Sequence, residues 1–202
     1  MNMRKIFVCA FAMLASTQVA HAVTVTSFTD KQTFQNQLAG SATVGFGGVA
    51  ANRVITGQYA PWGVTFTDGD DRSHHSPTLF PTDGRGLSGG ASTEIAFDQS
   101  WNAFGFSTPG EVDLQFFDGS TAIGGPLNFL PSGGGGSFGG FVTDTPFDRV
   151  VITSPDGSVL LDDITFGGSD VATVPVPMSA MLLGTAVAGL GFAGRRRRSA
   201  AV

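Results

Sequence analysis

Two adjacent carboxylates, Asp162 and Asp163, are the side chains most able to do chemistry, because they interrupt an otherwise apolar segment. Side chains alternate along a strand, so at least one of these carboxylates points toward apolar neighbours such as Leu161 or Ile164. A buried carboxylate without a partner is strongly unfavourable. Three arrangements are open: a bound calcium ion, an ion pair with Arg149 on the neighbouring predicted strand, or a strand-end bulge that leaves both aspartates in water.

A second acidic cluster comprises Asp68, Asp70 and Asp71 and is followed by the adjacent histidines His74 and His75. Alternating carboxylates could bind calcium, but the remaining ligands of an EF-hand loop, including its terminal glutamate, are missing. The pattern therefore favours a solvated loop. Two adjacent histidines do not easily face one metal ion, and the segment offers no cysteine or spaced third histidine for a zinc site.

Residues 86–90, Gly-Leu-Ser-Gly-Gly, match the nucleophile elbow of serine hydrolases around Ser88. The context argues against this interpretation, because no helical pattern follows and both nearby histidines precede the serine, whereas that fold requires its histidine last. The two glutamates, Glu94 and Glu111, lie in no recognisable site. The sequence therefore favours a protein that is not an enzyme. A glycan hydrolase with two facing carboxylates is the alternative.

Charge and cysteine content exclude further classes of function. All 16 acidic residues lie between Asp30 and Asp170, whereas six of the 11 basic residues lie near the two ends, so the region between them has a net charge of 5 − 16 = −11. Such a surface repels nucleic acid. The single cysteine, Cys9, lies in an apolar N-terminal stretch, so the rest of the chain has neither a disulfide nor a catalytic thiol.

The middle of the chain has the pattern of short strands separated by glycine and proline, which predicts an all-β fold, an antiparallel β-sandwich. Residues 111–117 alternate polar and apolar, and residues 147–153 and 158–166 flank a turn signal as a predicted hairpin. The other predicted strands are 43–46, 63–67, 93–97, 102–107, 127–130 and 138–143. The 18 phenylalanines against one tyrosine predict a core of aromatic rings without polar groups.

One short helix is expected over residues 31–39. Thr29 and Gln32 have the spacing of a capping box, and Phe34 and Leu38 lie on one face. Gly40 offers a C-terminal stop.

The N-terminus has the pattern of a signal peptide over residues 1–22. Arg4 and Lys5 precede the apolar stretch 6–14, and Ala20 and Ala22 supply the small residues that a signal peptidase recognises, so we expect cleavage after Ala22. The body that remains, residues 23–168, is long enough for one domain with its own core. Residues 169–173 form a short polar linker.

The C-terminus has three parts, residues 174–202 in all. The motif Val174, Pro175, Val176 and Pro177 precedes an uncharged run of 17 residues, 178–194, and four arginines follow it. As a helix the run spans roughly 26 Å, just enough to cross a membrane. The arginines, which stop transfer and keep this end in the cytoplasm, are Arg195, Arg196, Arg197 and Arg198.

This tail resembles the PEP-CTERM protein-sorting signals of Gram-negative bacteria, in the variant with Val-Pro-Leu-Pro in place of Val-Pro-Glu-Pro. The resemblance covers residues 173–198, and the motif here differs by one residue from either form. It implies export, transient anchoring in the inner membrane, and processing at the motif by an exosortase-type membrane transpeptidase. It also implies a final place at the cell surface or in the extracellular matrix, with links to exopolysaccharide and biofilm.

The body resembles the exported β-sandwich domains that such proteins often carry, which are similar in outline to galactose-binding and carbohydrate-binding jelly rolls. The similar segments are 26–34, 59–66, 147–152 and 161–166. The resemblance implies a structural calcium ion near Asp162 or Asp163 and glycan contacts through exposed aromatic residues. The candidates are Tyr59, Trp62 and Trp101, and partial burial in the core is the alternative for each.

Overall fold

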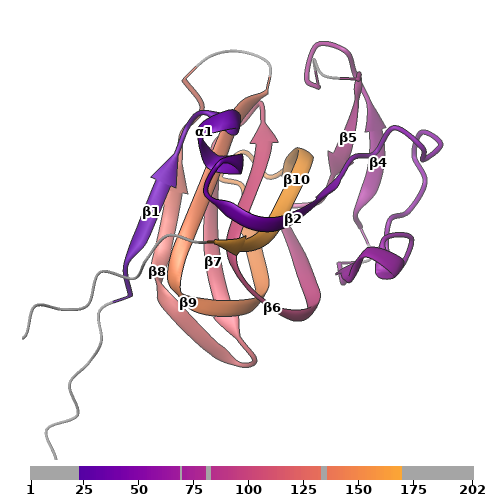
Figure 1. Ribbon diagram of the computed structural model, residues 1–202. Helices are drawn as coiled ribbons and strands as arrows, with labels where there is room; N and C mark the ends of the chain where they lie inside the picture. The colour runs from indigo at the N-terminus through magenta and orange to yellow at the C-terminus, as the bar shows by residue number, and fades with distance from the viewer. Residues whose placement is uncertain (1–22, 69, 81–82, 133–135, 170–202) are drawn as a thin grey trace, which may run out of the picture.

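The computed structural model describes residues 23–68, 70–80, 83–132 and 136–169 (Figure 1). The strands are β1 (Val25–Phe28), β2 (Leu38–Val44), β3 (Val64–Phe66), β4 (Arg72–His75), β5 (Arg85–Ser88), β6 (Ser92–Thr108), β7 (Val112–Asp118), β8 (Thr121–Phe129), β9 (Ser137–Thr153) and β10 (Leu160–Ser169). Two short helical segments, α1 (Lys31–Gln35) and the 3-10 turn η1 (Ala60–Trp62), complete the described chain. The expected all-β antiparallel class is confirmed.

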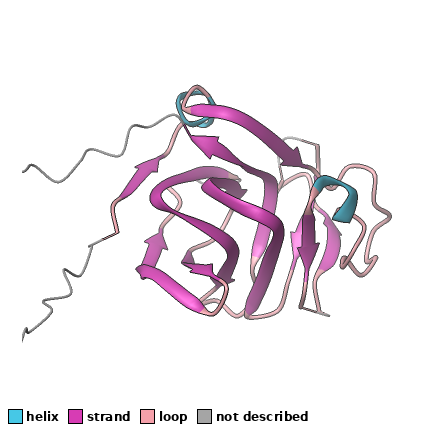
Figure 2. Ribbon diagram, turned by 60° about the horizontal axis from the view of Figure 1, so that its bottom comes forward, coloured by secondary structure: helices cyan, strands magenta, loops and turns pink. Residues whose placement is uncertain are grey.

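Hydrogen bonds join the ten strands into one sheet with the order β4-β5-β10-β6-β9-β7-β8, while β1, β2 and β3 pair with β9, β10 and β6 respectively. The two longest strands, β6 and β9, have 17 residues each and carry most of this pairing. Their mutual register shifts between Ala96 and Ala103, where β6 bends. Because of such bends the sheet curls around its own inner face instead of remaining flat (Figure 2).

The predicted hairpin of residues 147–153 and 158–166 is wrong. A turn does close at residues 154–157, with a hydrogen bond from the Gly157 N–H to the Ser154 carbonyl. However, β9 and β10 do not pair with each other, since both pair with β6, which lies between them. A turn signal fixes where the chain reverses but not which strand it then meets.

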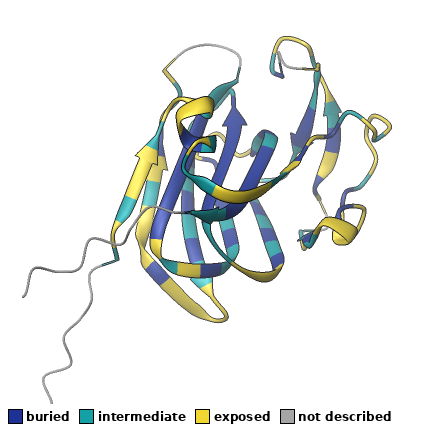
Figure 3. Ribbon diagram, viewed as in Figure 1, coloured by how far each residue is buried: buried dark blue, intermediate teal, exposed yellow. Residues whose placement is uncertain are grey.

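The inner face of the sheet is a core rich in phenylalanine, as predicted. Val112, Leu114 and Phe116 alternate with more exposed residues along β7 and are all buried (Figure 3). Phe116 packs on Phe147 with ring centroids 4.7 Å apart, and further rings continue the contact through the core. Phenyl rings need no hydrogen-bond partners, so they can fill an interior at no polar cost.

The expected helix is shorter than predicted and begins differently. It covers Lys31–Gln35, and the residue that caps it is Asp30, whose carboxylate accepts a hydrogen bond from the Thr33 N–H at 2.7 Å. Thr29 is therefore not the cap, because the aspartate one position later offers a charged acceptor to the same end of the helix. Phe34 is fully buried, and Leu38 already lies in β2.

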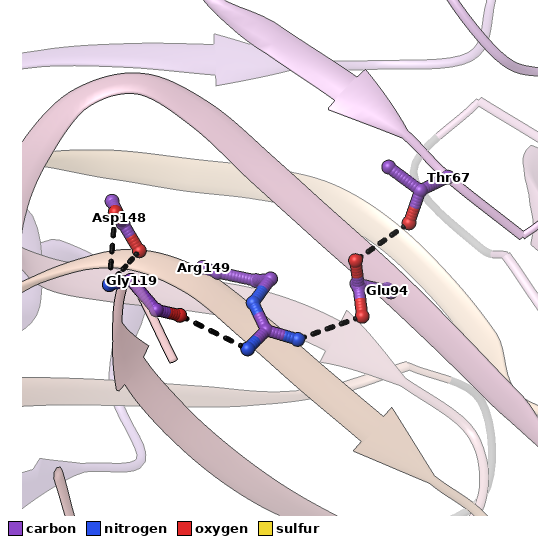
Figure 4. A network of polar contacts seen from close by, with 5 residues as sticks. All are labelled: Thr67, Glu94, Gly119, Asp148 and Arg149. Carbon is purple, nitrogen blue, oxygen red and sulfur yellow. Dashed lines mark hydrogen bonds and ion pairs between the residues drawn. The ribbon is translucent and has the colours of Figure 1, made fainter. Parts of the chain in front are cut away.

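Arg149 pairs with Glu94 instead of Asp162. Its guanidinium lies 2.9 Å from the Glu94 carboxylate, donates to the Gly119 carbonyl at 3.1 Å and covers the Phe117 ring at 4.2 Å (Figure 4). Glu94 also accepts a hydrogen bond from the Thr67 hydroxyl at 2.9 Å. The predicted Asp162–Arg149 pair is wrong, because β6 separates β9 from β10.

Replacing Glu94 by glutamine should therefore lower the free energy of unfolding by about 1 kcal/mol, since the ion pair is half-buried and one partner keeps its other contacts. Urea denaturation followed by circular dichroism measures this difference. Glu111→Gln is the matched control, because the Glu111 carboxylate meets only the Asn128 amide among its described hydrogen bonds. Equal stability of the two variants would contradict the assigned role of Glu94.

Candidate functional site

Tyr59 and Trp62 form an aromatic pair in which one ring is buried and the other faces solvent. Their ring centroids lie 5.7 Å apart, Tyr59 is 5% exposed and Trp62 is 60% exposed. Below them, Tyr59 meets the edges of Phe46 and Phe66 at 5.6 and 5.9 Å. Trp62 is thus an exposed ring supported from the core, and its neighbour Tyr59 is a supporting residue.

The local sequence around Trp62 explains its exposure. Pro61 favours the 3-10 turn η1, and Gly63 ends it in the left-handed conformation at φ 78°. A β-carbon at Gly63 would meet the Asp98 carboxylate, and the left-handed backbone at this position also favours glycine. The turn therefore lifts the indole off the sheet before β3 begins.

An open groove of about 520 Å³ lies beside this aromatic pair. Its walls come from the loop that follows β2 and from the segment that leads into η1. The lining residues are Gly45, Gly48, Val49, Ala50, Arg53, Gln58, Tyr59 and Trp62. We call this site the Tyr59–Trp62 groove. It combines a broad aromatic face with one cationic side chain, Arg53.

Hydrogen bonds to the backbone carbonyls hold the walls of the groove. The Tyr59 hydroxyl donates to the Gly45 carbonyl at 3.0 Å, and the Gln58 side chain bridges the Val54 carbonyl and the Thr56 N–H. The carbonyls that accept at least one hydrogen bond are those of Gly45, Phe46, Gly47, Val49, Ala50, Asn52, Arg53, Val54, Thr56, Gly57, Tyr59 and Ala60. Such a wall is preorganised, so a ligand would not have to order it.

Sequence reasoning missed Arg53 and this groove. The two walls meet through tertiary contacts, for example the hydrogen bond from the Tyr59 hydroxyl to the Gly45 carbonyl. One local signal was present, because a tryptophan between Pro61 and Gly63 is typical of a turn that projects its side chain.

Trp101 is not part of the groove. It lies at the bend of β6, is half-buried, and packs on Phe166 with centroids 5.6 Å apart. Within the described residues its ring has no contact with Tyr59 or Trp62, and its buried indole N–H has no hydrogen-bond partner. The core alternative therefore holds for Trp101, while Trp62 alone of the three candidates is an exposed platform.

Asp162 and Asp163 have different environments. The structure has the bulge that was one of the three alternatives, and Asp163 adopts a positive φ of 50° there. However, Asp162 is buried at 3% exposure, and Asp163 forms an ion pair with Lys31 at 2.9 Å. The alternative with both aspartates in water is therefore wrong. The sequence does not indicate Lys31 as the ion-pair partner of Asp163, because the two residues are far apart along the chain.

Burial raises the pKa of Asp162 to about 7, the Asp163 N–H opposes this by donating a hydrogen bond at 2.7 Å, and the charges of Asp163 and Asp83 raise it further. Burial and the charges of Asp162 and Asp83 also raise the pKa of Tyr59 to about 12. The Tyr59 phenol therefore stays protonated at neutral pH and acts as a hydrogen-bond donor under the groove.

Asp71 is a second buried carboxyl, contrary to the predicted solvated loop. It is fully buried, one of its oxygens accepts a hydrogen bond from the Thr93 hydroxyl at 2.8 Å, and the other has no hydrogen-bond partner among the described residues. Burial raises its pKa to about 7, and the charges of Asp68 and Asp70 add to the shift. Its burial follows from the hydrogen bond that the Ile55 N–H donates to its carbonyl, which holds the end of the loop inside the fold.

The described side chains do not match a calcium or zinc site. Across residues 23–68, 70–80, 83–132 and 136–169, no three histidine, cysteine or acidic side chains converge on a point. At Asp162 one nearby carboxylate is already paired with Lys31. Calcium usually takes six to eight oxygen ligands, so the arrangement does not favour it there. The calcium ion stays a prediction, and melting with and without a chelator tests it.

Ser88 is at the end of β5, and the chain continues from it toward β6 rather than into a helix. The strand–turn–helix geometry of a nucleophile elbow is thus missing at this serine. His74 and His75 lie on β4, which pairs with β5 through Gly86 and Arg85. No arrangement of serine, histidine and carboxylate is formed by these residues.

The predicted terminal signals lie outside the described residues. They are the cleavage residues Ala20 and Ala22, the motif of Val174, Pro175, Val176 and Pro177, and the arginines Arg195, Arg196, Arg197 and Arg198. In the described part of the chain no helix is long and apolar enough to cross a membrane.

The fold and the groove define an antiparallel all-β protein with a supported aromatic surface site. No protein-family model and no curated protein sequence matches the chain. Solved structures with a similar outline include a variant of CBM29-2, a family 29 carbohydrate-binding module, at 12% identity and a TM-score of 0.37, covering 68% of this chain and 98% of that one.

Another family 29 module is 14% identical with a TM-score of 0.28, covering 76% of this chain and 96% of the other. The enzymatically active domain of tailspike protein 4 from bacteriophage CBA120 is 15% identical with a TM-score of 0.33, covering 58% and 21%. Likeness at this level defines neither a family nor a ligand.

Proposed function

We propose that this chain is an exported, non-catalytic glycan-binding protein and that the Tyr59–Trp62 groove is its binding site. One observation carries the proposal: Trp62 is 60% exposed and its ring is held from below by buried Tyr59 at the edge of a preformed groove. A soluble domain gains nothing in stability by holding an indole in water. An exposed aromatic residue that is fixed in place is typical of a binding surface.

The chemistry of the groove suits a sugar. A pyranose ring presents apolar C–H faces, which pack on an aromatic side chain, and polar groups at its rim, which need hydrogen-bond partners. Trp62 offers the flat face, and Arg53 beside it offers the hydrogen-bond donors of its guanidinium. An open groove rather than a closed cavity favours a chain of sugars over a small free ligand.

The placement of the chain ends supports presentation of this groove at a surface. In Figure 1 the start of β1 and the end of β10 lie on the left, whereas β4, β5 and the loop that lines the groove lie on the right. Figure 2 gives the same separation. A tether that follows β10 would therefore hold the protein by the side opposite to the groove and leave the groove open to a matrix polysaccharide.

The tail supplies such a tether in our proposal. Val174 to Pro177, the uncharged run and the arginines would anchor the chain in the inner membrane until an exosortase-type transpeptidase processes the motif. The mature protein would then be at the cell surface or in the extracellular matrix, associated with exopolysaccharide. Mass spectrometry of protein from native cells tests this: ends near Val23 and Val174 are expected, and extracellular protein that keeps Arg195 to Val202 would overturn it.

Glycan binding is tested with the full-length protein on a panel of immobilised neutral and acidic polysaccharides. We expect retention on at least one of them, and loss of that retention in Trp62→Ala. A folded protein that is retained on no member of the panel, or whose Trp62→Ala variant is retained equally, would overturn the proposed site.

A further inference from the structure

Most backbone carbonyls along the walls of the Tyr59–Trp62 groove already accept one hydrogen bond from within the protein, including those of Gly45, Val49 and Ala50. The Gln58 amide is also engaged at both ends, by the Thr56 N–H and the Val54 carbonyl. A ligand that needs many acceptors therefore finds few in this groove. The Arg53 guanidinium, in contrast, pairs with no residue that the structure describes.

Arg53 is the main donor left. Its backbone is fixed by hydrogen bonds with Ser73, which takes the Arg53 N–H on its hydroxyl and donates its own N–H to the Arg53 carbonyl. The side chain is exposed, lines the groove, and forms no ion pair with any residue that the structure describes. A guanidinium carries five N–H donors in a planar fork and accepts none.

The chain segment that contains every residue lining the groove is less acidic than the rest of the protein. Residues 45–90 carry three arginines and four acidic residues, a balance of 3 − 4 = −1, whereas residues 23–44 and 91–169 together carry two basic and 11 acidic residues, 2 − 11 = −9. One of the four, Asp71, is fully buried. The average charge of the chain, which argues against polyanions, therefore does not describe this segment.

We propose that the groove selects a sugar ring that bears a carboxylate, with the ring stacked on Trp62 and the carboxylate bound by Arg53. The inference rests on the proposed function and adds the class of sugar to it. A planar carboxylate accepts two parallel hydrogen bonds from a guanidinium, which fixes the ring relative to the indole. A neutral sugar lacks this contact, and most of the wall carbonyls that its hydroxyl groups could meet already accept one hydrogen bond.

The probe is an oligogalacturonate together with its methyl ester, which has the same rings without the charge. Isothermal titration of the full-length protein should give about tenfold tighter binding of the acid, as one charge-assisted hydrogen-bonded pair provides. Arg53→Gln should remove this preference, so that the acid and the ester bind with the same affinity. Arg53→Lys should keep part of it, because the charge remains and the planar fork is lost.

Arg72→Gln is the matched control, since Arg72 belongs to the same segment, 45–90, but does not line the groove, and the described hydrogen bond of its side chain goes to the Asn52 carbonyl. If Arg53→Gln and Arg72→Gln lose equal affinity for the acid, the acid is bound by general electrostatic attraction, and the role of Arg53 would be overturned. Equal binding of acid and ester, both dependent on Trp62, would overturn the selection of a carboxylate while the glycan site stands. Tighter binding of a sulfated oligosaccharide than of the acid would also overturn it. If both probes bind and the Trp62→Ala variant binds them equally well, the proposed function itself would be overturned.

Discussion

Trp62→Ala should lower affinity for the bound glycan about 30-fold, the loss of about 2 kcal/mol that is typical when a central aromatic contact is removed. The indole is the largest flat apolar surface of the Tyr59–Trp62 groove, and Tyr59 holds it in place before any ligand arrives. Because Trp62 is 60% exposed, its removal takes little from the core. Isothermal titration gives the affinity, and a melting curve shows that the variant remains folded.

Leu130→Ala provides the control for this experiment. Leu130 is 67% exposed, follows β8, and is the other large apolar side chain that faces solvent in the described residues. Its removal takes a similar apolar surface from another part of the molecule, so affinity should not change. Trp62→Phe should recover part of the loss, since a smaller ring still stacks. A Trp62→Ala protein that melts like the natural one and binds with the same affinity would eliminate the groove as the glycan site.

The local part of the fold could be predicted from the sequence because it depends on neighbours along the chain. Alternation in β7 placed Val112, Leu114 and Phe116 on the buried face correctly. The excess of phenylalanine over tyrosine correctly indicated a core of apolar rings. Patterns of this kind report which face of an element is buried, and burial is what selects them.

Pairing between distant strands could not be predicted in the same way. The segments 93–97 and 102–107 were expected as separate strands, but they are parts of one bent strand, β6. Because β6 lies between β9 and β10, these two strands do not form the predicted hairpin, and Arg149 on β9 pairs with Glu94 instead of Asp162. Local turn chemistry does not say which strands pair, since register depends on the whole sheet.

The candidate site was predicted by residue type and not by arrangement. Tyr59, Trp62 and Trp101 were equal candidates in the sequence, because an aromatic side chain suits either a core or a binding surface. In the structure the three side chains differ in burial: Tyr59 is buried beneath Trp62, Trp62 is exposed, and Trp101 packs on Phe166. No sequence pattern marked Arg53 as a site residue. Its role as a donor depends on its place in the groove, beside carbonyls that already accept hydrogen bonds from other residues.

The stability of the protein should decrease as pH rises from about 4 to about 7, because two buried carboxyls, Asp71 and Asp162, each have a pKa raised from 3.8 to about 7. The folded protein binds protons in this range that the unfolded chain has released. The contribution of these protons to the free energy of unfolding is therefore complete below about pH 4 and is lost as the pH rises through about 7. Two such groups together lose about 2.7 kcal/mol of stability per pH unit between pH 5 and pH 7, so the midpoint of thermal unfolding should fall by on the order of 10 °C between pH 5 and pH 8.

The double variant Asp71→Asn and Asp162→Asn should flatten this dependence, since an amide keeps the size and hydrogen bonds of a carboxyl but does not titrate. Above pH 7 it should be more stable than the natural protein, because it buries no charge. Asp156→Asn, in the exposed turn before β10, is the control and should keep the full slope. A double variant as steep as the natural protein would mean that other groups cause the pH dependence. A midpoint that rises from pH 5 to pH 8 would mean that these carboxyls are stabilised as anions. A chelator that lowers the midpoint at pH 8 would then identify a bound cation as the partner, since removal of a ligand that binds only the folded state destabilises it.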